Sequence, residues 1–223
     1  MTTMKIDIVS DIACPWCAIG YARLENAMRS LSDELDFRLE WHAFELNPDA
    51  SADGEPILPA LSRKYGRSTE EMKAAQDDMM AIARELGLNF ERMQERHTCN
   101  TFDSHRLVKW AAEQNRQTDM KKAFFEAYFG HAANISDPEA LIRCVESIGL
   151  SGDEARKVLK SDSYADVVRQ DEARYQRAGV SAVPTFVIND RYMISGAQDP
   201  ETLVRAFREI AAESSPDPAA STS

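Results

Sequence analysis

Strand-forming patterns occur only towards the two ends of this chain, and helix-forming patterns fill the long stretch between them. Residues 4–10 form a buried apolar run, and residues 35–43 alternate apolar and polar side chains as a half-buried strand does. The next strand-like runs, at residues 184–188 and 191–195, flank the pair Asn189–Asp190, which suits a hairpin turn. An amphipathic helix separates the first two strands, and this βαβ unit predicts a parallel pair with a right-handed crossover.

Helical patterns dominate the middle of the chain. After a predicted loop at residues 47–59, which holds three prolines and a glycine, a capping box from Ser68 to Glu71 starts a helix that Gly87 ends. Further helices are predicted at residues 101–115 and 152–160. Three others are predicted to begin at residue 118, near residue 136 and at Asp199, and one is predicted to end at Gly179.

The layout predicts an α/β fold in three parts. Residues 1–46 and 180–213 form a discontinuous domain around the sheet, and residues 47–179 form a helical insertion after the second strand. Residues 214–223 hold two prolines and no large apolar side chain, so we expect a disordered tail. With 43% apolar and 28% charged residues, the chain of 223 residues has the composition of an ordinary globular protein.

The charge and the N-terminus limit the partners and the compartment. A net charge of −11 argues against a nucleic-acid groove or an anionic membrane surface as the main partner. The first residues show neither the basic nor the apolar region of a signal peptide, and no apolar stretch is long enough to cross a bilayer. We therefore expect a cytosolic protein whose thiols are kept reduced.

The pair Cys14 and Cys17 stands between the first strand and the first helix, in the segment "DIACPWCAIG". A structural zinc site needs four ligands, usually in two close pairs. Cys99 and Cys144 are solitary, and His97 lies at an unsuitable spacing from Cys99, so no metal site is expected. A redox dithiol is the better interpretation.

The position of the pair gives the two thiols different chemistry. Cys14 falls at or just before the first helical turn, where unpaired N–H groups and the helix dipole favour a thiolate. Pro15 suits that first turn because it has no N–H to leave unsatisfied. Cys17, one turn further on, should be buried, less acidic and placed to resolve a mixed disulfide. Trp16 either contacts substrate or packs on the surface.

Pro184, in "SAVPTF", is the second candidate site residue. It opens a strand, where a proline cannot donate to the ladder. Only about 5–6% of X-Pro bonds are cis, so the ordinary expectation is a trans bond, and the sequence does not assign the isomer.

Together these features resemble a known family. A strand, CPWC and a helix, then a helical insertion and "GVSAVPTFVIN", are similar to the DsbA-type branch of the thioredoxin superfamily. Three segments resemble its FrnE-like subgroup more narrowly: "NTFDSHRLVKWA" (100–111), "NISD" (134–137) and "RYMISGAQDPE" (191–201). The resemblance spans residues 4–212 and implies a thioredoxin-like fold with a large helical domain inserted after the second strand.

The resemblance also implies roles for individual residues. In such proteins the first motif cysteine is the nucleophile and the second resolves, which assigns Cys14 and Cys17. A cis-proline loop faces the pair, and the residue before the proline offers backbone hydrogen bonds to a substrate chain, which assigns Pro184 and Val183. DsbA itself has Pro-His between its cysteines, where this chain has Pro-Trp, so its strongly oxidising character is not implied. DsbA is also exported. Some FrnE-like proteins carry extra cysteines that exchange with the first pair, whereas this chain has no second close-spaced pair.

The remaining cysteines and histidines carry weaker expectations. Cys144 shares the apolar face of a predicted helix and should be core, whereas Cys99 lies in a loop and is a candidate for reactivity. His105 should contact core polar groups, His42 should be exposed on the polar face of its strand, and His131 has no supporting pattern. The aromatic residues Phe124, Phe125, Tyr128 and Phe129 should form the core of the insertion, with the lining of a substrate groove as the alternative for part of the cluster.

We predict a thiol–disulfide oxidoreductase that uses Cys14 and Cys17 without a cofactor, with Pro15, Trp16, Val183 and Pro184 in contact with substrate. The expected partners are disulfide-containing proteins or peptides, or glutathione; the oligomeric state and the direction of electron flow stay open. One alternative is a glutathione-dependent isomerase or transferase of the 2-hydroxychromene-2-carboxylate isomerase or kappa type, which has a similar inserted architecture but typically serine as nucleophile and no resolving cysteine. The other is a non-catalytic chaperone or adaptor, which would need neither cysteine.

Overall fold

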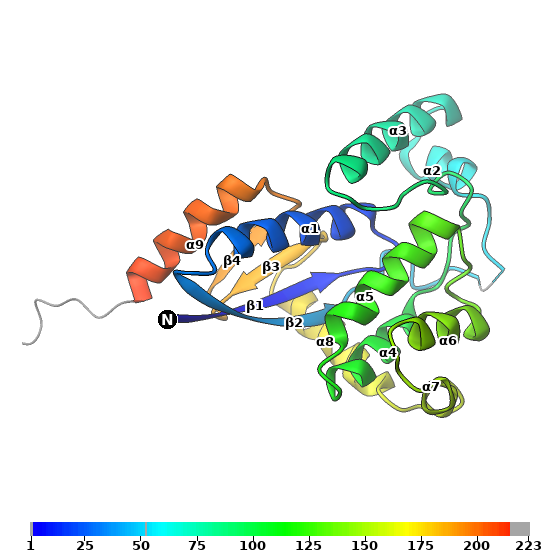
Figure 1. The fold of residues 1–223 in the computed structure, drawn as a ribbon. Helices are drawn as coiled ribbons and strands as arrows, with labels where there is room; N and C mark the ends of the chain where they lie inside the picture. Colours follow the sequence, from blue (N-terminus) through cyan, green and yellow to red (C-terminus); the bar gives the residue numbers. More distant parts are fainter. Residues whose placement is uncertain (1, 52, 215–223) are drawn as a thin grey trace, which may run out of the picture.

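The computed structural model describes residues 2–51 and 53–214, and its centre is a four-stranded sheet (Figure 1). The strands are β1 (Thr2–Ser10), β2 (Leu35–Ala43), β3 (Thr185–Ile188) and β4 (Tyr192–Ser195). They lie in the order β2-β1-β3-β4: β1 and β2 are parallel, while β3 is antiparallel to both β1 and β4. The predicted parallel pair and late hairpin are therefore confirmed.

Nine helices occur within the described residues. They are α1 (Pro15–Ser30), α2 (Ile57–Tyr65), α3 (Thr69–Glu85), α4 (Phe102–Ala112), α5 (Gln117–Phe125), α6 (Pro138–Ser147), α7 (Gly152–Leu159), α8 (Ala165–Arg177) and α9 (Pro200–Ser214). A π-helical turn, Glu126–Gly130, follows α5 directly.

Helices cover both faces of the sheet. α1 packs against α9, and its Tyr21 ring lies 4.9 Å from the Trp41 ring of β2. α8 packs against β2 as well, with the Tyr175 ring 4.8 Å from the His42 ring. Neighbouring residues of a strand point to opposite faces, so α1 and α8 lie on opposite sides of the sheet. Helices α2 to α7 gather around the end of the sheet where β1 and β2 end (Figure 1).

The start of α2 differs from the prediction. Residues 47–59 were expected to be loop throughout, but α2 already begins at Ile57. Pro59 occupies the first turn of this helix, where the backbone N–H groups have no partner within the helix, so a proline there breaks no hydrogen bond. The predicted capping box of α3 is present, because Ser68 Oγ accepts from the Glu71 N–H and the Glu71 carboxylate accepts from the Ser68 N–H.

The prediction for His42 was wrong. This residue is 4% exposed, because α8 covers the face of β2 that carries the polar side chains. Its ring Nδ1 lies 3.0 Å from Asp171 Oδ1 of α8. The alternating pattern of β2 correctly separated the two faces. On the polar face Asp36 and Arg38 are exposed, whereas His42 lies under α8 and is paired with charged groups.

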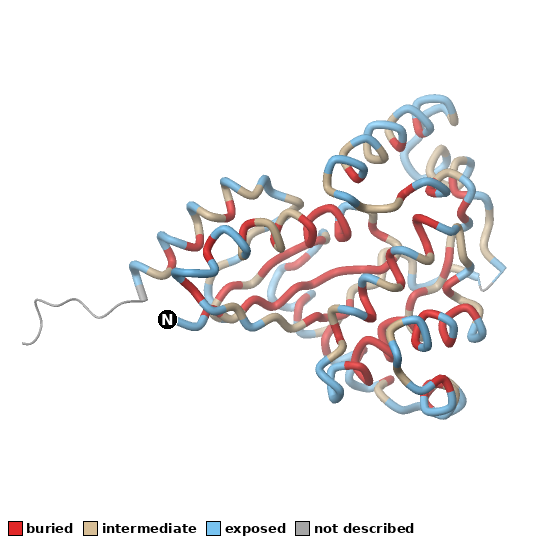
Figure 2. Tube along the Cα trace, viewed as in Figure 1, coloured by how far each residue is buried: buried red, intermediate tan, exposed pale blue. Residues whose placement is uncertain are grey.

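The core runs along the central strands and between the helices. Figure 2 shows buried residues concentrated along β1 and on the inward sides of the helices. The edge strand β2 is buried at Leu35 and at its end, from Trp41 to Ala43. The expected aromatic core of the helical segment is buried, at Phe124, Phe125, Tyr128 and Phe129. Within residues 2–51 and 53–214, every helix is too short or too polar to traverse a lipid bilayer. Most of the predicted tail, residues 215–223, lies outside the described residues.

Candidate active site

The two cysteines of the motif lie at the start of α1, just beyond the end of β1. Cys14 is the N-cap residue, with extended backbone angles (φ −91°, ψ 112°), and Pro15 takes the first helical position. This placement agrees with the sequence prediction for Cys14. The first N–H groups of a helix have no partner within it, and together with the helix dipole they favour an anion at this position.

Asp11 holds the short loop that leads to Cys14. Its backbone carbonyl accepts from the Cys14 N–H at 3.3 Å, its Oδ1 accepts from the Ala13 N–H at 3.3 Å, and its Oδ2 accepts from the Leu46 N–H at 2.8 Å. His105 Nε2 lies 3.4 Å from Asp11 Oδ1. Burial alone would raise the pKa of the Asp11 carboxyl, but the hydrogen bonds and the charge of His105 outweigh it and lower that pKa. The loop that leads to the two thiols therefore holds a buried carboxylate.

Cys17 lies one helical turn after Cys14 and is more deeply buried, at 1% against 5% exposure. Its backbone N–H donates to the Cys14 carbonyl at 3.0 Å. Burial, together with the hydrogen bond and charge of the neighbouring Cys14, raises the pKa of the Cys17 thiol well above its ordinary value. Cys17 is thus the buried, less acidic thiol that its position in the helix predicts.

The loop before β3 faces Cys14. The peptide bond between Val183 and Pro184 is cis, and Cys14 Sγ lies 3.5 Å from the Val183 carbonyl oxygen. This is the isomer that the family resemblance implied, not the commoner trans form. The Pro184 carbonyl accepts from the Gly196 N–H at 2.8 Å, which ties the loop to the end of β4. Residues 169 positions apart in the chain are brought together in this way.

A wide cleft of about 1420 Å³ opens beside Cys14. One wall is formed by the start of α1 and by residues 181–183; the other is formed by α2, α3 and the loop at residues 46–51. Trp16, at 37% exposure, lies in the first wall, and Tyr65 of α2, at 60%, lies in the second. Large aromatic side chains on both walls of an open cleft beside a thiol are suited to holding a ligand against that thiol.

The other two cysteines are buried. Burial raises the pKa of the Cys99 thiol to about 12 and that of the Cys144 thiol to about 11. Cys144 is therefore core, as expected, and Cys99 is not an open, reactive thiol. His105 contacts core polar groups, as expected, with Nε2 3.2 Å from the Phe44 carbonyl. His131 is exposed and lies 3.2 Å from a Glu126 carboxylate oxygen.

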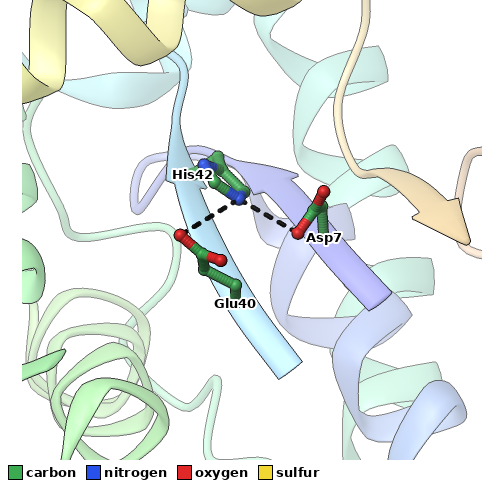
Figure 3. Close-up of side chains that lie close together, drawn as sticks. All are labelled: Asp7, Glu40 and His42. Carbon is green, nitrogen blue, oxygen red and sulfur yellow. Dashed lines mark ion pairs between the residues drawn. The ribbon is translucent and has the colours of Figure 1, made fainter. Parts of the chain in front are cut away.

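Three side chains of metal-binding type meet on the α8 side of the sheet (Figure 3). Asp7, Glu40 and His42 each place one ligand atom within 4.8 Å of the others. Protein cations already occupy this cluster, however: His42 Nε2 lies 3.3 Å from Asp7 Oδ1, and Lys5 Nζ lies 3.1 Å from Asp7 Oδ2. Asp171 binds the opposite ring nitrogen of His42. We therefore describe the cluster as a buried ion-pair network around a histidine.

Residues 5–208 match the DSBA-like thioredoxin domain. The chain belongs to this family. Bacillus subtilis (strain 168) YwbO, an uncharacterized protein, is 30% identical to it over 211 residues, which are 93% of this chain and 97% of that one. The probable DsbA oxidoreductase SCO1869 from Streptomyces coelicolor has a similar crystal structure, with a TM-score of 0.89 and 36% identity over 96% of this chain and 92% of that one.

A more distant structure shares the fold. The cytosolic disulfide reductase DsbM from Pseudomonas aeruginosa, solved with GSH, has a TM-score of 0.61 and 17% identity over 94% of this chain and 99% of that one. These likenesses confirm the predicted DsbA-like thioredoxin fold. As a member of the DsbA-like family, the protein is an oxidoreductase in its broad class.

Two ionisable residues of the site are not singled out by the sequence patterns. Asp11 stands three residues before Cys14, at the end of a buried strand, and only its spacing from the motif could have drawn attention to it. Lys121 is fully buried in α5, although it is a lysine. It occupies the same helical stripe as Met120 and Phe124, so a charged residue within an apolar stripe is the pattern that could have revealed it.

Proposed function

We propose that this protein is a thiol–disulfide oxidoreductase in which Cys14 is the nucleophile and Cys17 the resolving thiol. The single observation that carries the proposal is the arrangement of the pair. Cys14 caps α1 beside the cleft and the Val183–Pro184 loop, while Cys17 is buried one turn behind it with a raised pKa. A thiol at a helix start that lines a cleft, with a more deeply buried thiol one turn behind it, suits exchange in two steps.

In the reducing direction, the Cys14 thiolate attacks one sulfur of a substrate disulfide. The substrate S–S bond breaks, the released thiolate takes a proton from water, and a mixed disulfide joins Cys14 to the substrate. Cys17 then loses its proton and attacks Cys14 Sγ, which forms the Cys14–Cys17 disulfide and releases the second substrate thiolate. The substrate gains two electrons and two protons, and a further dithiol must reduce the protein again. The oxidising direction reverses these steps.

The cleft supports a polypeptide substrate. Pockets for small ligands span roughly 300–1,000 Å³, and this cleft, at about 1420 Å³, exceeds that range. Its lining includes Met79, which is partly exposed, and Met72 and Met93, which are buried. Methionines are flexible and polarizable, and they suit contact with varied apolar side chains. We infer that an extended segment lies along the cleft, with Trp16 against it and the Val183 backbone beside the reacting sulfur.

The proposal also includes the finer assignments made from the sequence. The FrnE-like subgroup rests on three sequence motifs, and a cytosolic location draws support from DsbM, which is described as cytosolic. Glutathione is a reasonable thiol partner, because the DsbM structure contains GSH.

The test is disulfide exchange with a protein substrate, measured for the native chain, Cys14→Ser and Cys17→Ser, with Cys144→Ala as a matched control that removes a buried thiol outside the proposed pair. Both site variants should lose turnover, and Cys17→Ser should accumulate a mixed disulfide on Cys14. Trp16→Ala should raise KM severalfold with unchanged unfolding, because the ring is 37% exposed.

The outcomes separate the alternatives. Full exchange activity in Cys14→Ser would overturn the proposal. Loss in Cys14→Ser with full glutathione-dependent activity in Cys17→Ser would favour the isomerase or transferase type, which uses one nucleophile. Suppressed aggregation of an unfolded client by the doubly substituted protein, without exchange activity in the native chain, would favour a chaperone.

A further inference from the structure

Lys121 is the feature that the dithiol chemistry leaves unexplained. Its side chain is 0% exposed, and among the described residues its Nζ has no hydrogen-bond partner. Nζ lies 5.3 Å from the centroid of the Trp41 ring and 5.4 Å from that of Phe125. Buried polar groups almost always have hydrogen-bond partners, so a buried ammonium without one requires a physical reason.

Packing does not supply that reason. Two aromatic rings, those of Trp41 and Phe125, flank the Lys121 ammonium. An unbranched apolar side chain of similar length would fill the same volume without the desolvation penalty of a charge. The two rings stabilise a cation through their faces, but this offsets only part of that penalty. Burial lowers the pKa of Lys121 to about 8, so the amine is still mostly protonated at neutral pH.

The strongest electrostatic influence on Lys121 is Cys17. The negative charges that favour its ammonium form are, in decreasing order, those of Cys17, Asp11 and Cys14, while the charge of Lys109 opposes it. The effect is mutual, because Lys121 also acts to lower the pKa of Cys17. Lys121 also acts to lower the pKa of His105, a further ionisable neighbour.

The other charged neighbours are already paired. Asp11 accepts from the Leu46 N–H at 2.8 Å and lies 3.4 Å from His105 Nε2. Lys109 Nζ donates to the Trp41 carbonyl at 3.0 Å and forms an ion pair with Asp171. Lys121 can stabilise the anions of Asp11, Cys14 and Cys17. During the proposed reaction only the two cysteines gain and lose their negative charge.

We propose that Lys121 is a positioning residue for the resolving step, stabilising the thiolate of Cys17 as it attacks the mixed disulfide. The inference rests on the proposed dithiol function. In this step the Cys17 S–H bond breaks and its proton passes to solvent, the Cys14–Cys17 bond forms, and the bond from Cys14 to the substrate sulfur breaks. The departing substrate thiolate takes up a proton, so no other reactant is needed. Lys121 itself is fully buried, so its positive charge acts where charge interactions are strong.

The step can be observed with dithiobis(nitrobenzoate), which releases a coloured thiolate twice. The first release reports attack by Cys14, and the second reports displacement by Cys17. With reduced protein in excess over the reagent, Lys121→Met should leave the first rate within twofold and slow the second about tenfold at neutral pH. Removing the ammonium raises the pKa of Cys17 further and lowers its thiolate population, and the greater reactivity of a more basic thiolate recovers only part of that loss. Lys122→Met is the matched control, because this neighbouring lysine is 50% exposed.

The pH profile separates an electrostatic role from a merely structural one. The ammonium is present below about pH 8 and is lost as the pH rises through that value. The advantage of the native chain over Lys121→Met in the second release should therefore be largest near neutral pH and shrink above pH 8. Unfolding of Lys121→Met should need as much denaturant as the native chain, or more. Lys121→Leu serves as a second apolar variant.

Several results would overturn the inference. These are a second release within threefold of native in Lys121→Met, equal slowing of both releases, or an advantage that does not change with pH. If neither variant folds, the pH dependence of the native chain is the test. If the rate of its second thiolate release stays proportional to the hydroxide concentration from below pH 8 to above it, the ammonium of Lys121 has no role. Absence of any second release in the native chain would instead refute the dithiol function itself.

Discussion

Gly20 of α1 lies directly against Pro184 of the cis-proline loop. A Cβ atom added to Gly20 would lie 2.9 Å from Pro184 Cγ and 3.3 Å from Ala197 Cβ. Real Cβ atoms essentially never approach another heavy atom as closely as the first distance. Glycine is thus what allows α1 to approach the loop closely enough to hold Cys14 Sγ 3.5 Å from the Val183 carbonyl.

Gly20→Ala should therefore destabilise the protein and impair exchange. Replacing a mid-helix glycine by alanine stabilises a helix by about 1 kcal/mol, but overpacking costs about 1–3 kcal/mol, so we expect a net loss of about 1 kcal/mol. Urea unfolding measures the first effect and turnover on a protein disulfide measures the second. Ser30→Ala, at the exposed end of α1, is the control. If Gly20→Ala instead increases the free energy of unfolding by about 1 kcal/mol and keeps the native turnover, the loop is free to move away from α1.

The four thiols should differ strongly in reactivity. Cys14 lines the cleft, whereas burial raises the pKa of Cys99 to about 12 and that of Cys144 to about 11. An ordinary cysteine has a pKa of about 8.5, so the two buried thiols hold far less thiolate at neutral pH. Brief treatment of the reduced protein with iodoacetamide, followed by peptide mass spectrometry, should label Cys14 at least about 100-fold faster than either. In urea all four should react at similar rates; labelling of Cys99 in the folded state at the rate of Cys14 would contradict the burial.

Much of the fold and the cysteine pair could be predicted because the determining contacts are local. The capping box of α3 involves residues three positions apart, and the placement of Cys14 and Cys17 follows from a strand that runs directly into a helix. Each of these patterns can be recognised in a short window of sequence. Their agreement with the structure reflects that locality.

The parts that could not be predicted depend on distant segments. His42 looked exposed because its partner Asp171 lies 129 residues away, on a helix whose packing against β2 no local pattern reveals. The burial of Lys121 likewise requires β2, α1 and α5 to meet around one side chain. The isomer of the Val183–Pro184 bond is a property of the folded loop. The periodicity of a sequence predicts which face of a helix or strand a side chain lies on. It does not predict what covers that face, because tertiary packing determines this.

The His42 network should make stability depend on pH. Burial opposes the charged ring, but its bonds to Asp171 and Asp7 outweigh burial and raise the pKa of His42 above its ordinary 6.5. A raised pKa contributes stability that is fully present below pH 6.5 and is lost as the pH rises through the folded-state value. His42→Gln should therefore cost about 3 kcal/mol at mildly acidic pH and less at alkaline pH.

Urea unfolding of both proteins between pH 5 and pH 9 checks this prediction. In the native chain Asp7 does not titrate in this range, because, against the effect of burial, its pKa is lowered from 3.8 to about 2, mainly by His42 and Lys5. His131→Gln, which changes an exposed histidine, should show no such dependence. A stability difference for His42→Gln that stays constant with pH would mean that the ring is neutral in the folded protein.

Gln117 should be essential for docking α5 onto the sheet. β2 is an edge strand, and the Gln117 side chain completes its hydrogen bonding: Oε1 accepts from the Trp41 N–H at 2.9 Å, and Nε2 donates to the Trp41 carbonyl at 3.1 Å. Gln117→Met keeps the length but leaves the Trp41 N–H without a partner, while the carbonyl keeps Lys109. We expect a loss of about 2 kcal/mol in urea unfolding, against almost none for Gln114→Met in the exposed turn between α4 and α5.

The same substitution connects stability to the resolving step. Gln117 and Lys121 are one helical turn apart on the buried stripe of α5, so loosening the first contact changes the position of the second. Gln117→Met should slow the second thiolate release, but less than Lys121→Met does, because the ammonium is still present. A variant that loses stability and keeps the native second rate would show that α5 docking and the Cys17 step are independent. A second rate as slow as that of Lys121→Met would mean that the position of the charge matters as much as its presence.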